Sequence, residues 1–361
     1  MIPHRVLMTV DAVGGVWTYA AELAAQLRMR EIEVVLAVVG PAPSAAQMRA
    51  MRGTDVRVTG LPLDWLADDA DEVRRSASEV VALARSVDAD LVHLNSPTLA
   101  GFAEFDAPVV GACHSCLASW WRDVRGGEMP AEFRMRTEWL ARGYRACRVL
   151  MAPSAAFAAS TFSLYGVRPH VVLNGRGNRG RIADSRKQRV ALTAGRLWDD
   201  GKNFGALDKA AARMRYPLVA AGPLVGANGT LVSPRNARAL GPLSEAKLDR
   251  WMNRAAVFVS IARYEPFGLC VLEAAQAGCA LVLSDIPSFR ELWSGAAMFV
   301  PLDDDEAVSR AVNLLIENEA VRSGCVARSV ELARRYRPEA MADGMLAVYA
   351  AAGSAKACAV A

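Results

Sequence analysis

The chain has 361 residues, of which 53% are hydrophobic and 22% are charged, and its formal net charge is +4 at pH 7. This length is long for one α/β domain and sufficient for two, each with its own core. The mild positive charge suits anionic ligands such as diphosphates, and it does not indicate a protein that binds nucleic acid.

The chain shows no sign of a membrane-spanning or secretory segment. No apolar run approaches the roughly 20 residues that a membrane helix needs. The opening stretch MIPHRVLMTVDAVGG lacks the long hydrophobic region and the cleavage site of a signal peptide. We therefore expect a cytoplasmic protein.

Seven cysteines are scattered along the chain without the spacing of a disulfide framework, which favours a reducing compartment. Cys113 and Cys116 form a CxxC motif, but a zinc site would want a second ligand pair, which the four histidines do not supply. A thioredoxin-type redox role is also disfavoured, because the motif lies within an ordinary α/β pattern. We expect no metal site.

The first 40 residues predict a strand, a glycine loop, a helix and a second strand. The loop Asp11–Val16 separates the strand Arg5–Val10 from a helix over Trp17–Met29, and a buried strand follows at Glu33–Val39. Such a βαβ unit implies a parallel sheet. Further elements are expected at Leu61–Leu66 (short apolar segment), Ala70–Val87 (helix), Leu91–Leu94 (strand), Pro108–Ala112 (strand), Glu132–Arg145 (helix), Val149–Ala152 (strand), Ser154–Tyr165 (helix) and His170–Leu173 (strand).

Residues 174–189 are polar, basic and glycine-rich, so we assign them to a linker. Gly175, Gly177 and Gly180 match the dinucleotide fingerprint, but no apolar helix follows to hold a pyrophosphate, which disfavours a nicotinamide or flavin site. After the linker the alternation restarts, with strands expected at Val190–Ala194, Pro217–Ala221, Ala237–Leu240, Val257–Ser260, Ala280–Ser284 and Met298–Pro301, and helices at Asn203–Met214, Ser244–Arg254, Leu269–Ala277, Asp304–Glu317, Val321–Tyr336 and Pro338–Ala351.

This order of elements predicts two Rossmann-like, doubly wound α/β domains. We expect an N-terminal domain over residues 1–173 and a C-terminal domain over residues 190–336. A ligand cleft is expected between them, at the carboxyl ends of the strands.

The segment from Glu265 to Gly278 concentrates polar groups between a predicted strand and a helix. Pro266 keeps Glu265 out of the helical conformation, and Gly268 permits a close turn before the helix begins. The free amides of such a helix start can bind phosphate or sugar oxygens, and Glu273 lies about one turn further on. Carboxylates accept hydrogen bonds from vicinal sugar hydroxyls. The alternative is that both acids are solvated side chains near a helix start.

The spacing of Glu265 and Glu273, in the context EPFGLCVLEA, resembles the donor-site signature of the retaining glycosyltransferases of family four. The stretch SDIPSFREL, which starts at Ser284, is similar to the turn that precedes the next helix in that family. The resemblance is strong over residues 190–302 and thin over residues 40–90. It implies the GT-B fold, with two Rossmann-like domains facing across a cleft and a C-terminal helix, residues 337–361, that packs back on the first domain.

The resemblance also implies roles for residues of the C-terminal domain. Glu265 would contact hydroxyls of the transferred sugar, and Glu273 would bind the ribose. Arg196 and Lys202 would neutralise the leaving diphosphate, and fixed cations do stabilise charge that develops in a transition state. Two basic side chains on a surface loop are the alternative. Backbone amides would hold sugar or phosphate oxygens at Phe267, Gly268, Leu269 and Cys270.

In the first domain, the resemblance implies that the backbone at Gly15 approaches the donor phosphate and that His114 lies near the reacting sugar carbon. A core or capping histidine is the alternative for His114. Asn95 stands where many members have a histidine or an aspartate, so we assign it no role.

The resemblance implies transfer with retention, by front-face attack of the acceptor with the leaving phosphate as base, and without a metal. The acids at 303–305 are interpreted as a helix N-cap region rather than a metal motif. The alternatives are a sugar-nucleotide epimerase of GT-B architecture, a phosphorylase, and a non-catalytic protein that binds nucleotide-sugars.

The acceptor is left open by the sequence, and a sugar, a lipid-linked molecule or another small molecule would fit. Residues 119–127 read as an aromatic and basic loop, and a set of arginines follows it at Arg134, Arg136, Arg142, Arg145 and Arg148. Such a mixture can touch a membrane, here the inner face, as a peripheral contact. A solvated amphipathic helix is the favoured interpretation.

Overall fold

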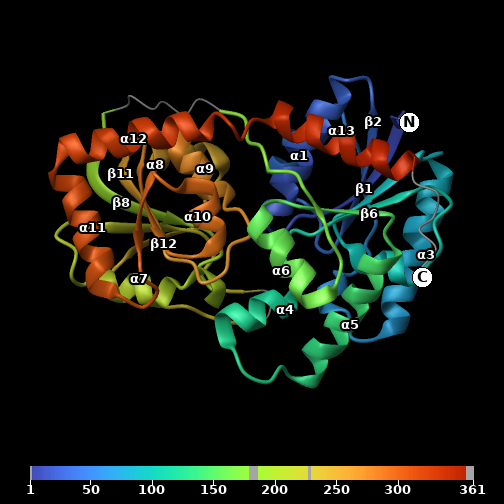
Figure 1. Cartoon of the computed structure of the whole chain (residues 1–361), viewed down its shortest axis with the longest axis horizontal. Helices are drawn as coiled ribbons and strands as arrows, with labels where there is room; N and C mark the ends of the chain where they lie inside the picture. Colours follow the sequence, from blue (N-terminus) through green and yellow to red (C-terminus); the bar gives the residue numbers. More distant parts are fainter. Residues whose placement is uncertain (1, 179–185, 227–228, 355–361) are drawn as a thin grey trace. The chain divides into compact units, whose positions relative to one another are not determined.

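A computed structural model of the chain describes residues 2–178, 186–226 and 229–354. The chain folds into two compact units (Figure 1). Unit 1 consists of the chain up to Gly175, without Asp123–Arg125, together with the helix that begins at Pro338. Unit 2 consists of Asp123–Arg125 and the chain from Arg176 to Arg337.

The described residues of unit 1 form a seven-stranded parallel sheet in the order β3-β2-β1-β4-β5-β6-β7. The central strands are buried on both faces, as a parallel sheet covered by helices requires. The strands are β1 (Arg5–Asp11), β2 (Glu33–Val39), β3 (Asp55–Val58), β4 (Leu91–Leu94), β5 (Val109–Ala112), β6 (Val149–Ala152) and β7 (His170–Val171).

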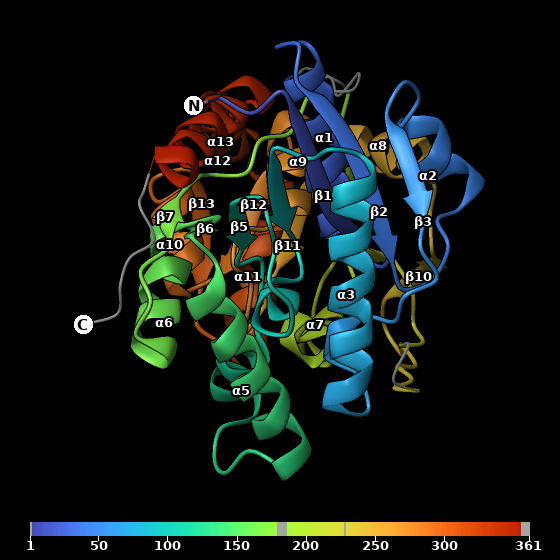
Figure 2. The same cartoon turned by 90° about the vertical axis from the view of Figure 1, so that its right-hand side faces the viewer.

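The helices of unit 1 cover both faces of this sheet. Helices α1 (Gly15–Arg28) and α13 (Pro338–Ser354) share one apolar core with alternate residues of β1 and β2. Helix α3 (Ala70–Ser86) lies on the other face, where it shares a second core with η2 (Pro97–Gly101) and where Trp139 of α5 (Ala131–Ala146) packs (Figure 2). The remaining helices are α2 (Ala45–Ala50), η1 (Asp64–Leu66), α4 (Leu117–Trp120), η3 (Trp121–Arg125) and α6 (Ala155–Tyr165).

The described residues of unit 2 form a six-stranded parallel sheet in the order β10-β9-β8-β11-β12-β13. Helices α7 and α11 share one core with β8 and β11. The strands are β8 (Gln188–Ala194), β9 (Leu218–Ala221), β10 (Arg238–Gly241), β11 (Ala255–Ser260), β12 (Ala280–Ser284) and β13 (Ala297–Val300). The helices are η4 (Asp200–Lys202), α7 (Phe204–Ala211), α8 (Glu245–Arg254), α9 (Leu269–Gln276), α10 (Pro287–Trp293), α11 (Asp305–Glu317) and α12 (Glu319–Ala333). The expected pair of doubly wound α/β domains is confirmed.

The segment expected to be an aromatic and basic loop, residues 119–127, is largely helical, so that prediction was wrong. Helix α4 leads directly into the π-helical turn η3. Cys116 starts this helix, because its sulfur accepts a hydrogen bond from the amide of Ser119 at 3.4 Å and its carbonyl oxygen accepts one from the Ser119 hydroxyl at 3.1 Å. Cysteine is not among the residues that mark a helix start in a sequence.

The predicted linker begins with buried residues rather than in solvent. Asn174 and Arg176 are both buried, and the backbone amide of Arg176 donates a hydrogen bond to the carbonyl of Tyr336 at 3.1 Å. Near the other end, the Lys187 ammonium donates to the carbonyls of Met252, Asn253 and Ala277 at 2.5–3.1 Å. Residues 179–185 of the predicted linker, with Gly180 of the fingerprint, lie outside the described residues.

Within the described residues, no helix combines the length and the apolar character that crossing a membrane requires.

Candidate active site

Two loops of unit 2 meet at the carboxyl ends of β8 and β11. The carbonyl of Gly201, in the loop after β8, accepts hydrogen bonds from the amides of Arg263 at 2.9 Å and Tyr264 at 3.2 Å, which follow β11. Asp199 shapes the first loop, because its carboxylate accepts from the amide of Gly201 at 2.9 Å. Open α/β sheets bind ligands at the carboxyl ends of their strands. In this sheet, two loops joined by hydrogen bonds form that edge.

This junction brings together two of the predicted site residues. The ammonium of Lys202 lies 2.5 Å from the carboxylate of Glu265, and both side chains are largely buried, with exposed fractions of 22% and 17%. A second hydrogen bond, from the Ser288 hydroxyl to the carbonyl of Glu265 at 2.5 Å, fixes the backbone of the same residue. These contacts fix the carboxylate of Glu265 and the ammonium of Lys202 side by side.

Arg196 occupies a more open position on the same loop. Its guanidinium lies 2.9 Å from the carboxylate of Asp199, and its side chain is 40% exposed. The Asp199 side chain is only 10% exposed, so the guanidinium of Arg196 is the more open member of this pair. Arg196 is therefore placed on the predicted loop as a cation that a ligand can reach.

The start of α9 supplies the backbone donors that the sequence predicts. Gly268 has a φ of +90°, which favours glycine, and a Cβ there would lie 3.2 Å from both Phe289 and Val271. Leu269 and Cys270 follow as the first helical residues, whose amides have no acceptor within a helix. Phe267 anchors the turn, since its buried ring lies edge-on to Tyr336 at 5.5 Å between centroids.

Several charged side chains lie near the thiol of Cys270. Burial raises the pKa of Cys270 to about 12, and the nearby charges of Glu273, Lys202, Glu265 and Arg176 also act on this pKa. The thiol therefore stays protonated at neutral pH. Two carboxylates and two cations surround the first turn of α9.

Arg176 is the site residue that the sequence analysis missed. Its Nε donates to the carboxylate of Glu273 at 2.6 Å, and its Nη2 lies 3.1 Å from the carboxylate of Glu245. The side chains of Arg176 and Glu273 are 2% and 8% exposed, so this pair is buried. The carbonyl of Arg176 also accepts from the Gln276 amide at 2.7 Å, one turn further along α9. Glu273 is therefore held by a fixed guanidinium and is not the solvated acid of the alternative interpretation.

A contact between two glycines holds the loop after β8 against the loop after β9. Gly222 has a φ of +140°, and a Cβ on it would lie 1.8 Å from the carbonyl oxygen of Gly195. Gly222→Ala should therefore displace the backbone just before Arg196. We expect a loss of at least about 1–3 kcal/mol in the free energy of unfolding, from the strained backbone alone, and a weaker affinity for nucleoside diphosphates, measured by thermal unfolding and calorimetry.

Gly205→Ala provides the matched control for this variant. Gly205 lies in α7, and a Cβ on it would meet nothing within 4 Å. Alanine in a helix is about 1 kcal/mol more favourable than glycine, so this variant should gain stability. A Gly222→Ala protein as stable as Gly205→Ala would contradict the role of the glycine contact.

In unit 1, the remaining predicted residues lie at the carboxyl ends of β1 and β5. Gly15 is the first residue of α1, and His114 follows β5 by two residues. Tyr19, one turn into α1, places its ring edge-on to the His114 ring, with centroids 4.6 Å apart. Burial lowers the pKa of His114 to about 4, so the imidazole is neutral at physiological pH.

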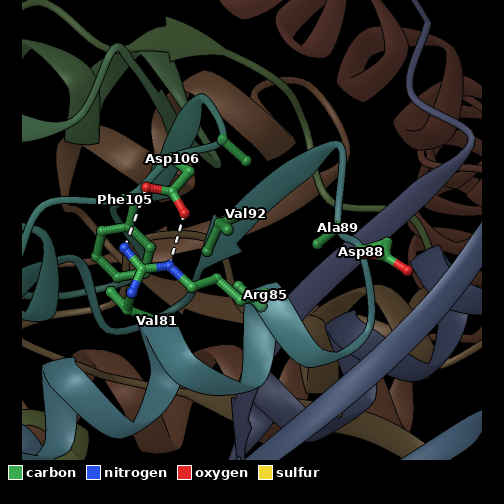
Figure 3. A pocket seen from close by; sticks show the side chains of 9 residues that line it. Val81, Arg85, Asp88, Ala89, Val92, Phe105 and Asp106 are labelled. Atoms are coloured by element: carbon green, nitrogen blue, oxygen red, sulfur yellow. Dashed lines mark hydrogen bonds and ion pairs between the residues drawn. The ribbon is translucent and has the colours of Figure 1, made fainter.

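Unit 1 also has two cavities, which lie away from these residues. One, of about 310 Å³, is lined by Asp88 and Ala89 before β4, by Ala107 before β5 and by the ion pair of Arg85 and Asp106 (Figure 3). The other, of about 510 Å³, lies at the starts of β1, β2 and β3. Both are at the amino ends of the strands, opposite to the edge that binds ligands in open α/β sheets.

The predicted helix N-cap in the acidic run is confirmed, since the Asp304 carboxylate accepts from the amide of Ala307 at 2.7 Å. In the parts of the chain that the structure describes, no group of three or more His, Cys, Asp or Glu side chains is arranged to hold a metal ion.

Two models of known protein families match this chain, one in each half. The family model described as Glycosyltransferase Family 4 matches residues 13–176, and the one described as Glycosyl transferases group 1 matches residues 188–318. The fold and the family matches together define the class, a glycosyltransferase with the GT-B fold. Within that class, the N-terminal half is similar to glycosyltransferase family four and the C-terminal half to the group 1 glycosyl transferases.

Curated relatives match parts of the chain. A phosphatidyl-myo-inositol mannosyltransferase of Mycolicibacterium smegmatis is 32% identical over 115 residues, which are 31% of this chain and 30% of that protein. A GDP-mannose:cellobiosyl-diphosphopolyprenol alpha-mannosyltransferase of Xanthomonas oryzae is 39% identical over 74 residues, which are 20% of each chain. The matched stretches span less than a third of these two relatives.

Solved structures match nearly the whole chain at low identity. Sucrose-phosphate synthase from Thermosynechococcus elongatus superposes with a TM-score of 0.77 and 16% identity, over 98% of this chain and 100% of that one. The Anabaena protein HepE, in complex with UDP-glucose, superposes with a TM-score of 0.72 and 17% identity, over 95% and 98% of the two chains. At this level of identity the likeness shows the GT-B fold.

Proposed function

We propose that this protein transfers a sugar from a nucleoside diphosphate sugar to an acceptor hydroxyl, with retention of configuration and without a metal ion. The observation that carries the proposal is the pair of carboxylates, Glu265 and Glu273, each held by a cation at the start of α9. Such a site offers acceptors for hydroxyls and donors for phosphate oxygens within one helical turn.

Each group has a proposed role in binding the donor. Lys202 and Arg196 neutralise the diphosphate, together with the free amides at the start of α9. Glu273 accepts hydrogen bonds from the ribose hydroxyls, and Arg176 fixes the orientation of its carboxylate. Glu265 accepts hydrogen bonds from the transferred sugar.

In the proposed reaction, the bond between the anomeric carbon and the phosphate oxygen breaks while the acceptor oxygen attacks from the same face. The leaving phosphate takes the proton of the acceptor hydroxyl, and Lys202 and Arg196 stabilise the negative charge that the phosphate gains. Unit 1 contributes the neutral imidazole of His114 and the backbone at Gly15. The expected location in the cytoplasm stays a prediction, and a peripheral contact with a membrane stays the alternative to a solvated amphipathic helix.

The relatives named above are mannosyltransferases by name, so GDP-mannose is the first donor to test, beside UDP-glucose and ADP-glucose. We expect release of nucleoside diphosphate that depends on an added acceptor, with the same rate in EDTA and an unchanged anomeric configuration in the product by NMR. Conversion of the donor into another nucleotide-sugar without release would favour the epimerase. Absence of binding to any of the three donors would overturn the proposal.

Glu273→Gln tests the ribose contact without removing side-chain volume. We expect the Kd for the preferred nucleoside diphosphate to rise by about 10–100-fold, because a hydrogen bond to a charged group is worth about 1.5–3 kcal/mol. The 2′,3′-dideoxy analogue, which lacks the hydroxyls, should bind the variant and the parent protein alike. An equal loss of affinity for both nucleotides would refute the ribose role.

A further inference from the structure

A hydrogen bond joins the ends of two neighbouring strands of unit 1. The Nε2 atom of His114, after β5, lies 2.7 Å from the Oδ1 atom of Asn95, which directly follows β4. The two residues belong to adjacent parallel strands, since β4 and β5 pair through Leu94 and Gly111. The fold therefore fixes this contact at the carboxyl edge of the sheet.

The contacts with Thr9 and His114 require one orientation of the Asn95 amide. Its Nδ2 donates to the carbonyl of Thr9 at 2.6 Å, and its backbone amide donates to the Thr9 hydroxyl at 2.9 Å. Thr9 lies in β1 and is fully buried. A carbonyl oxygen can only accept, so Nδ2 must face Thr9 and Oδ1 must face the imidazole.

This orientation determines which nitrogen of His114 carries the proton. Because Oδ1 of Asn95 can only accept, the Nε2 atom of a neutral His114 must donate, and the lone pair is then on Nδ1. The described residues provide no hydrogen bond to Nδ1. One ring nitrogen is thus engaged by the protein, and the other is an acceptor.

The groups around the ring keep it neutral. Tyr19 from α1 lies edge-on to His114, and His93 from β4 is itself buried and neutral, since burial and the proximity of His114 lower its pKa to about 3. The hydroxyl of Tyr349, from α13, lies 2.7 Å from Nδ1 of His93. The described groups that face the pair from α1, β4 and α13 are therefore uncharged.

We propose that Asn95 is a positioning residue that holds His114 as the Nε2–H tautomer, so that Nδ1 accepts a hydrogen bond from a hydroxyl of the bound sugar. This inference rests on the proposed function, because it assigns the ligand of Nδ1 to the sugar substrate. A sugar hydroxyl can donate a hydrogen bond to the neutral Nδ1 atom of this fixed ring.

The tautomer can be read directly by ¹⁵N–¹H correlation NMR on the full chain. The His114 signals are identified by their loss in His114→Asn, which leaves three histidines. We expect the Nε2-protonated neutral form from pH 8 to pH 5.5, since the pKa of about 4 places protonation below that range. Protonation of Nδ1 or a titration midpoint near 6.5 would overturn the proposal.

Two variants of Asn95 test its positioning role. Asn95→Asp keeps an acceptor oxygen toward Nε2, so it should keep the tautomer, but its second oxygen cannot donate to the carbonyl of Thr9 and its negative charge should raise the pKa of His114. Asn95→Leu has no acceptor, so both tautomers should appear in the spectrum, and kcat should fall by about tenfold, the equivalent of one lost hydrogen bond, with an unchanged Kd for the nucleoside diphosphate. An Asn95→Leu protein that keeps the Nε2–H tautomer would overturn the proposal.

The NMR and kinetic results separate this inference from the proposed function. A protein without transferase activity would refute the proposed function, while the spectrum would still decide which nitrogen is protonated. An active enzyme with an Nδ1–H tautomer would refute this inference alone.

Discussion

Lys202→Met should lower kcat/KM by about 10²–10³-fold, the range measured when one fixed group that stabilises developing charge is removed. Its ammonium is 2.5 Å from Glu265 and largely shielded from solvent. A shielded cation stabilises a leaving diphosphate more than an exposed one, since the surrounding dielectric is lower. The loss should therefore fall on the chemical step and be read from steady-state kinetics with the preferred donor.

The loop that carries Lys202 should survive this substitution. The amide of Lys202 still donates to the carbonyl of Asp199 at 2.8 Å, and Gly201 still accepts from Arg263 and Tyr264. Lys209→Met serves as the control, because Lys209 also pairs with a carboxylate, Asp305 at 3.5 Å, but is 73% exposed. Similar small losses in both variants would contradict the assignment of Lys202 to the diphosphate.

The sequence predicts the fold wherever apolar strands are buried. Strands β4, β6 and β12 begin and end at the predicted residues, because each is a short apolar run in the interior of a parallel sheet. The sequence analysis did not predict α2 and β3. Helix α2 buries none of its residues and β3 is a mostly exposed edge strand, so neither has the periodic pattern that a sequence prediction uses.

The site is predicted where its residues are close in sequence. Glu265 to Glu273 form one strand–loop–helix segment, whose turn chemistry and helix start can be read from Pro266 and Gly268. Arg176 could not be found in this way, because its partner Glu273 is 97 residues away and the glycine-rich context of Arg176 suggests a solvated linker. Asn95 is likewise explained only by its contacts with Thr9 and His114, across three strands.

Arg176→Met should lower the free energy of unfolding by about 3–5 kcal/mol, because it removes one member of a buried ion pair. For a unit of this size, that loss corresponds to a Tm lower by about 6–20 °C. Removal of both charges in Arg176→Met/Glu273→Met should restore most of the Tm, since apolar replacement of a whole buried pair is often neutral. Glu245, a second carboxylate that Arg176 contacts, is half exposed.

The double variant separates stability from function. If the buried pair serves only the fold, the protein with a restored Tm should bind nucleoside diphosphate as the parent protein does. If Glu273 is the ribose anchor, affinity should stay reduced by at least the 10–100-fold expected of Glu273→Gln, although the fold has recovered. Full binding in the double variant would therefore remove Glu273 from the donor site. Persistent loss would mean that a buried ion pair, a weak source of stability by itself, is present at α9 to orient a carboxylate toward the ribose.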